Sequence, residues 1–70
     1  MFDDELLRKE IALWDKNDRA FLTIMAKFIN DPFKPATDLY FKKFKHLDVF
    51  YDDKRFNARG IALVRILREQ

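Results

Sequence analysis

The sequence contains neither cysteine nor serine, and it has only one histidine and one glycine. Without cysteine there is no disulfide and no thiolate metal site. Without cysteine or serine the commonest nucleophiles of covalent catalysis are missing, and the pattern gives the single imidazole, His46, no orienting partner. One glycine cannot make a glycine-rich phosphate loop. We therefore predict a protein that is not an enzyme, with no catalytic residue and no cofactor.

Metal-ligand spacing and targeting signals are missing as well. The paired carboxylates Asp3–Asp4 and Asp52–Asp53 lack the spacing of a calcium loop, so we assign them to helix starts and turns and predict no metal site. The sequence begins Met-Phe-Asp-Asp-Glu, which lacks the basic and apolar regions of a signal peptide, and no long apolar run follows. The expectation is an intracellular, cytoplasmic protein without a membrane partner.

Hydrophobic and aromatic residues are abundant for so short a chain. Seventy residues make one domain, 1–70, of which 49% are hydrophobic and 16% aromatic, including eight phenylalanines. A chain of this size buries only about 60% of the surface that its unfolded form exposes. Either the core is unusually dense, or part of the aromatic surface is kept for a partner.

The most apolar stretch, residues 20–29, predicts the central helix of the domain. On a helical wheel of about 100° per residue its apolar side chains span roughly 200°, so more than one neighbour should cover it. The polar break before it and Pro32 after it set the expected bounds at 18–30. An acidic start followed by apolar periodicity predicts an earlier helix near 3–15, whose second apolar strip contains Phe2, Leu6 and Leu13.

A third helix is expected near residues 35–46. Pro35 suits a first turn, where its missing N–H does no harm. Tyr40 and Phe44 share one face of this helix, and lysines occupy the outer side.

Residues 49–69 allow two readings. In one, Asn57 caps a fourth helix near 57–69 and Gly60 lies in its first turn. In the other, residues 57–60 form a turn between the strands Val49–Phe56 and Ile61–Leu67. The predicted fold class is therefore all-α, a small single domain of three to four helices. The alternative is a winged-helix-like fold of three helices plus a C-terminal β-hairpin.

These helical faces predict a core. The residues expected to be largely buried are Leu7, Ile11, Trp14, Phe21, Ile24, Met25, Phe28, Tyr40, Phe44, Leu63 and Leu67.

The C-terminal part of the chain is electropositive, with ten basic and six acidic side chains in residues 27–70 against four and six in residues 1–26. Aromatic side chains off the main helical faces, next to lysine and arginine, have the composition of an interface anchor. The expected function is a small regulatory or accessory protein that binds a protein partner, or a second copy of itself, through an aromatic and basic helical surface. The expected partner-binding residues are Phe33, Phe41, Lys42, Lys43, Lys45, His46, Arg55 and Arg59.

The alternative function is a DNA-binding transcriptional regulator of winged helix-turn-helix type. The order of elements resembles that class at the level of fold, and the lysines of the third helix can neutralise phosphates. Its outer face, however, carries no arginine, asparagine or glutamine to read base edges.

Overall fold

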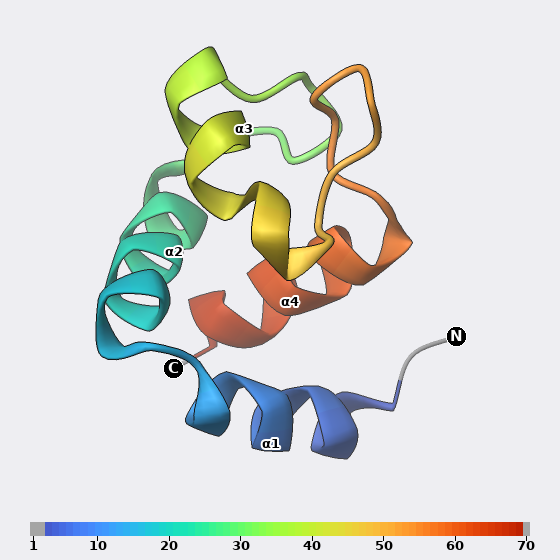
Figure 1. The fold of residues 1–70 in the computed structure, drawn as a ribbon. Helices are drawn as coiled ribbons and strands as arrows, with labels where there is room; N and C mark the ends of the chain where they lie inside the picture. Colours follow the sequence, from blue (N-terminus) through green and yellow to red (C-terminus); the bar gives the residue numbers. More distant parts are fainter. Residues whose placement is uncertain (1–2, 70) are drawn as a thin grey trace.

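The computed structural model describes residues 3–69, which fold into four α-helices and one turn of 3₁₀-helix (Figure 1). The elements are α1 (Asp4–Leu13), α2 (Lys16–Phe28), α3 (Asp38–Phe44), η1 (Lys45–Leu47) and α4 (Ala58–Arg68). The all-α prediction is confirmed, and each predicted helix is present with shifted ends.

Side-chain caps explain most of the helix starts. Asp3 Oδ1 accepts a hydrogen bond from the Glu5 N–H at 2.9 Å and opens α1. Thr37 Oγ1 accepts from the Tyr40 N–H at 3.4 Å, so α3 starts after Thr37, and Pro35 lies in the connection before it. At α4 the predicted cap is confirmed, because Asn57 Oδ1 accepts from the Gly60 N–H at 2.7 Å.

The hairpin reading of residues 49–67 is wrong, because its second strand, Ile61–Leu67, lies in α4. Only a trace of strand pairing is found in the described residues, an isolated antiparallel bridge between Phe50 and Phe56. That bridge closes a tight loop in which the Tyr51 N–H donates to the Arg55 carbonyl at 2.8 Å. The helix wins because the Asn57 cap starts it and its apolar residues then fill the core.

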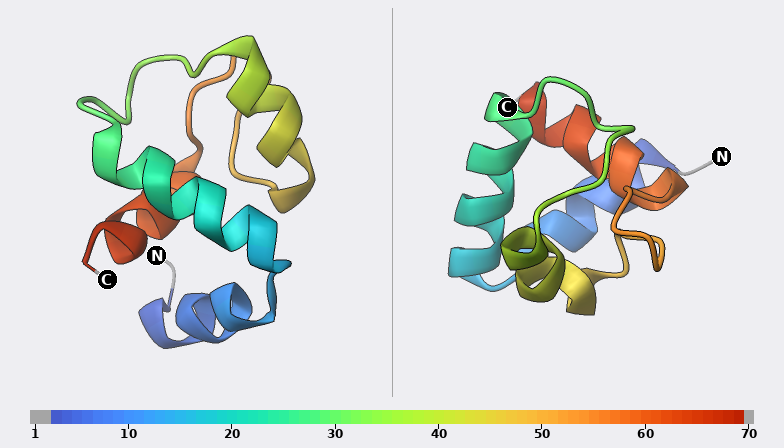
Figure 2. Two further views of the ribbon diagram at one scale, coloured as in Figure 1. Left: turned by 90° about the vertical axis from the view of Figure 1, so that its left-hand side faces the viewer. Right: turned by 90° about the horizontal axis from the view of Figure 1, so that it is seen from above.

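Helix α4, and not the predicted stretch 20–29, is the centre of the fold. It buries Gly60, Leu63, Val64, Ile66 and Leu67, and both α1 and α2 pack against it. In Figure 1, α1 lies below α4 and α3 above it, while α2 closes one side; Figure 2 shows the same arrangement from two further directions. Helix α2 buries only one flank, through Leu22, Met25 and Ala26.

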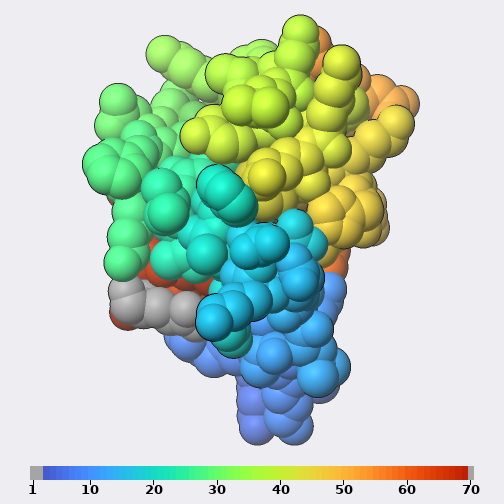
Figure 3. Space-filling view, turned by 60° about the vertical axis from the view of Figure 1, so that its left-hand side comes forward, coloured from blue at the N-terminus to red at the C-terminus, as the bar shows by residue number. Residues whose placement is uncertain are grey.

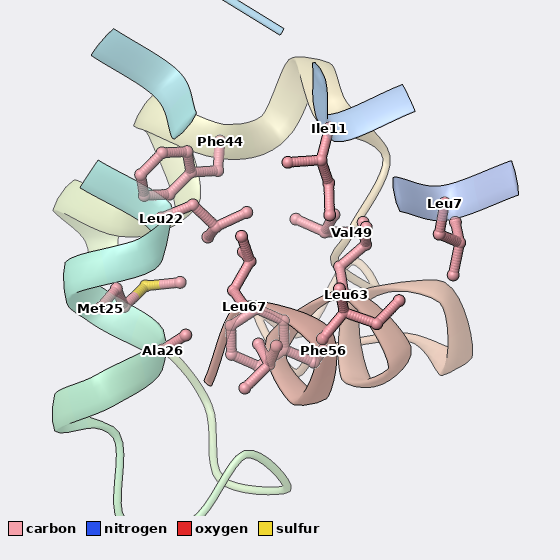
Figure 4. Close-up of a cluster of buried hydrophobic side chains, with 12 residues drawn as sticks. Leu7, Ile11, Leu22, Met25, Ala26, Phe44, Val49, Phe56, Leu63 and Leu67 are labelled. Carbon is pink, nitrogen blue, oxygen red and sulfur yellow. The ribbon is translucent and has the colours of Figure 1, made fainter. Parts of the chain in front are cut away.

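The buried side chains form one cluster contributed by all four helices and by the connection after η1 (Figure 4). Of the predicted core, Leu7, Ile11, Met25, Phe44, Leu63 and Leu67 are buried, and Trp14 and Tyr40 are partly buried against the cluster. The predictions for Phe21, Ile24 and Phe28 are wrong, because all three are exposed. The core also contains six residues that the predicted list did not include: Leu22, Ala26, Val49, Phe56, Val64 and Ile66.

Gly60 is the point where α4 and the preceding connection approach most closely. A Cβ atom built there would collide with the backbone carbonyl oxygen of Val49 and would come within 2.8 Å of the Phe56 ring. The Val49 carbonyl also accepts a hydrogen bond from the Asn57 N–H at 3.0 Å, so it cannot easily move away.

Gly60→Ala should therefore destabilise the protein, although alanine is favoured over glycine by about 1 kcal/mol inside a helix. The collision with the Val49 carbonyl should outweigh that gain and give a net loss of about 1–3 kcal/mol, the usual range for overpacking. Urea unfolding followed by circular dichroism measures the change. An unchanged or higher midpoint would show that the close approach at Gly60 is wrong.

Truncation of a buried and of an exposed phenylalanine should change the stability by very different amounts. Phe44→Ala should lower the free energy of unfolding by about 3–5 kcal/mol, because Phe44 is fully buried. Phe28→Ala should change it by less than about 0.5 kcal/mol, because the side chain is exposed. Thermal unfolding of both variants beside the wild type tests the pair, and a large loss from Phe28→Ala would contradict the fold.

Candidate functional site

Three large apolar side chains stand in a row on the outer side of α2. Phe21 is 46% exposed, Ile24 54% and Phe28 80%. At about 100° per residue they fall within an arc of roughly 60°, and all three side chains remain exposed. We call these three residues the α2 row.

Helix α3 lies beside α2 on this side of the molecule (Figure 3). At one end His46 Nε2 lies 2.7 Å from Asp18 Oδ2, and the next contact places Lys43 Nζ 4.0 Å from the centroid of the Phe21 ring. Leu39, which is also exposed, precedes Lys43 by one helical turn and so lies on the same side of α3. We define the α2–α3 face as the α2 row together with Leu39, Lys42 and Lys43.

A groove of about 430 Å³ lies at the end of the α2 row. Its apolar wall comes from both helices and from the connection between them: Met25, Phe28, Ile29, Pro35, Ala36 and Tyr40. Polar groups also line it, from Asn30, Asp31, Lys34 and Thr37. Phe28 belongs to both the row and the groove, so the two make one continuous surface.

The acidic side chains of α2 and α3 have partners, whereas most of the basic side chains do not have one within residues 3–69. The acids of α2 and α3 both have partners: Asp18 is hydrogen-bonded to His46, and Asp38 forms an ion pair with Lys54. The lysines and the arginine of α2, α3 and η1 have no ion pair within residues 3–69; they are Lys16, Arg19, Lys27, Lys42, Lys43 and Lys45. The surface around the α2 row therefore carries positive charge that its own residues do not neutralise.

The structure places some of the predicted binding residues at this face and others away from it. Lys42 and Lys45 are exposed on the outer side of α3, and Lys43 reaches the Phe21 ring. His46 is exposed, and its Nε2 atom contacts the Asp18 carboxylate. Phe41 points to the other side of α3, where its ring packs on Phe50 with the centroids 5.5 Å apart.

The remaining predicted residues lie elsewhere. Phe33 is exposed and lines a second groove, of about 340 Å³, beside Ile61 and Val64 of α4. Arg55 pairs with Asp53 inside its own loop, Nε to Oδ2 at 2.7 Å. Arg59 donates to both carboxylate oxygens of Glu10 and to the carbonyl of Leu47, so its guanidinium joins α4 to α1 and η1.

The residues that sequence reasoning missed are the α2 row and Leu39. Their signal was present in the width of the apolar arc of residues 20–29, roughly 200°, which is about twice what a single neighbouring element covers. The sequence reading assigned that whole arc to the core. Phe2, which it placed on the outer strip of α1, lies outside the described residues.

Neither a metal centre nor a membrane span is found in residues 3–69. No three acidic or histidine side chains there gather closely enough to hold a metal ion. None of the helices in that range has the length and apolar character that crossing a bilayer requires.

Geometry and composition define a small all-α domain with one apolar and basic face. No protein family model, no curated protein and no solved structure matches the chain. The function must therefore be argued from the surface itself.

The Glu10–Arg59 pair should make stability depend on pH. Hydrogen bonds from Arg59 hold the pKa of Glu10 below its ordinary value of 4.5, against the opposing effect of burial. Because the folded-state pKa is lowered, the stabilisation is present at pH 7 and is lost as the pH falls below about 4.5. Glu10→Gln should cost about 1 kcal/mol at pH 7, since 38% of the Glu10 side chain is exposed and water screens the pair.

Urea unfolding of wild type and Glu10→Gln between pH 7 and pH 3 measures this dependence, and the difference between the two should shrink toward pH 3. Glu69→Gln is the control, because the Arg8–Glu69 pair is more exposed on both sides and should be worth less. A difference for Glu10→Gln that stays constant with pH would show that the carboxylate does not stabilise the fold.

Proposed function

We propose that this chain is a non-enzymatic regulatory or accessory domain that binds another protein through its α2–α3 face. The observation that supports it is the exposure of Phe21, Ile24 and Phe28 side by side on one helix. Single exposed apolar residues are ordinary on a protein surface, but a contiguous row bordered by polar groups is typical of interaction sites. Aromatic side chains at the centre of such a patch commonly supply most of the binding energy.

The two halves of the surface have separate roles in this proposal. Phe28 and Ile24 supply the apolar contact, because covering them removes apolar surface from water at about 25 cal/mol per Å². Lys43 contacts the Phe21 ring, Lys42 precedes it on α3, and neither lysine has an ion pair within residues 3–69. Charges at such a rim act mainly on association rate and on the choice of partner.

A second candidate function, contact with duplex DNA, is favoured by one observation, the exposed lysines of α3 and η1. Lys42 and Lys45 can neutralise phosphates, as in any basic helix. The hairpin that would form a wing is absent, however, since Ile61–Leu67 belongs to α4. Phosphates also offer no apolar surface to the α2 row. A protein partner therefore accounts for both the apolar residues and the lysines of the α2–α3 face.

Site-specific photocrosslinking tests the proposal. The photoreactive residue p-benzoylphenylalanine replaces Phe28, and in a matched variant it replaces Tyr51, which is also an exposed aromatic residue but lies in the loop before α4. Irradiation in the native host should give a discrete protein adduct from position 28 and none from position 51. Adding Ile24→Glu should reduce the adduct at least tenfold, because it places a carboxylate in the apolar contact.

Two results would overturn the proposal. One is the absence of a protein adduct at position 28, and the other is an adduct there that Ile24→Glu leaves unchanged. Titration with short duplex DNA tests the second candidate: each lost lysine contact should lower the slope of log K against log salt by roughly one. Salt-sensitive binding that a Lys42/Lys43/Lys45→Glu triple variant loses, and Ile24→Glu keeps, would favour DNA instead.

A further inference from the structure

The spacing of the α2 row is that of a helix-packing seam. Asn17, Phe21, Ile24 and Phe28 follow one another at intervals of four, three and four residues, the spacing of alternating a and d positions in a coiled coil. Side chains at this spacing form knobs and holes that accept the side chains of a second helix. Helix α2 has 13 residues and is about 20 Å long, so it offers nearly two heptads of contact.

The neighbouring helix α3 borders this seam on one side. Leu39 and Lys43 stand one turn apart on α3, and the Lys43 ammonium lies over the Phe21 ring. A helix laid along α2 would therefore touch α3 on one flank. An amphipathic helix that lays its apolar face on such a surface is a common mode of peptide recognition.

A partner helix that lies along α2 would reach the groove at Phe28 with one of its ends. Pro35 and Ala36 line it together with Met25 of α2 and Tyr40 of α3. Its volume is about 430 Å³. One large apolar side chain at the end of a partner helix fits this space, with Asn30 and Thr37 at its edge for the partner's polar groups.

The positive charge of this face determines which charge a partner's side chains should carry. Lys27 lies one position before Phe28, and Lys43 contacts the Phe21 ring from the α3 side, with Lys42 next to it in the sequence. These three lysines have no ion pair within residues 3–69, whereas Asp38 pairs with Lys54 and Asp18 is hydrogen-bonded to His46. A partner with carboxylates beside its apolar stripe would pair with these lysines, and one with lysine or arginine there would be repelled.

The lysines and the groove argue against two other occupants of this face. A second copy of this chain would bring its own unpaired lysines to the contact, which is unfavourable. An anionic bilayer would attract the lysines, but a flat lipid surface leaves the groove beside Phe28 unfilled. A helical partner satisfies the seam, the groove and the lysines together.

We propose that the α2–α3 face binds an acidic amphipathic helix of another protein, which lies along α2 with one large apolar side chain in the groove between Phe28 and Tyr40. This inference rests on the proposed function and adds the class of partner.

Selection from a peptide library tests it. The probe is a displayed library of two-heptad peptides with apolar residues at a and d and an equal mixture of Glu, Lys, Gln and Ala elsewhere. Peptides that bind the wild-type protein are kept, and those that also bind Phe28→Glu are removed. Phe28 is 80% exposed, so this variant should fold, and circular dichroism checks that it does.

The expected result is enrichment of Glu over Lys in peptides that become helical on binding. They should lose at least tenfold in affinity with Phe28→Glu and with Lys42→Glu/Lys43→Glu. The control Leu6→Glu, on the exposed side of α1, should bind as the wild type does. In amide-proton NMR spectra the shifts should concentrate on residues 17–28 and 36–43.

Each other outcome overturns the inference. Enrichment of basic or uncharged peptides, shifts outside the α2–α3 face, or no enrichment at all would each reject an acidic helical partner. Wild-type dimers that Phe28→Glu dissolves would assign the face to a second copy. Binding to phosphatidylserine vesicles that Phe28→Glu abolishes, without peptide enrichment, would assign it to a membrane surface. If the adduct at position 28 forms but acidic peptides are not enriched, only the class of partner fails; loss of the adduct rejects the proposed function itself.

Discussion

The burial of α4 is the constraint on which the rest of this structure depends. Leu63, Val64, Ile66 and Leu67 span an arc of roughly 160° on that helix, and all four are buried. The partly buried Ile61 and Ala62 extend this arc on both sides. A chain of 70 residues has enough material to surround one helix, because small domains bury a limited share of their surface. Once α4 has taken the centre, α1 and α2 can each be covered only on the side that meets it.

The exposed α2 row follows from this constraint. Leu22 and Ala26 are completely buried against the rest of the core, and the small Ala26 side chain lets neighbouring elements approach α2 closely. The larger Phe21, Ile24 and Phe28 lie on another side of the helix and remain exposed. An apolar surface that the chain cannot cover by itself gains most from a partner, which is the physical basis of the proposed function.

Helix positions could be predicted from the sequence because their signals are local. The Asn57 cap of α4 and the break at Pro32 act within a few residues, and both kinds of signal are confirmed. The choice between the helix and the hairpin after residue 57 was open, because Gly60 suits either a first helical turn or a β-turn. What decides it is the burial of the apolar residues of α4 in the core, through contacts between segments that no local pattern shows.

The direction in which α2 faces could not be predicted, for a related reason. An apolar arc of roughly 200° contains two possible core faces, and the sequence offers no measure of which one a neighbour will occupy. Phe21, Ile24 and Phe28 were assigned to the core, yet Leu22 and Ala26 are the fully buried residues of this helix. The same limit applies to Arg59: its charge predicted a surface role, whereas Glu10 and the Leu47 carbonyl hold it as a tie between α1, η1 and α4.

The position of the lysines relative to the α2 row, and not their number, indicates which kind of partner they favour. Lys45 lies 6.0 Å from the Phe41 ring, on the side of α3 that packs on the loop before α4. Lys43 lies on the other side, against Phe21 and next to uncovered apolar surface. A phosphate backbone would use both lysines equally and would leave Phe28 in water, whereas a partner that carries apolar and acidic groups together would use Lys43 and Phe28 at once. The arrangement of charge relative to the α2 row therefore favours a protein partner over a nucleic acid.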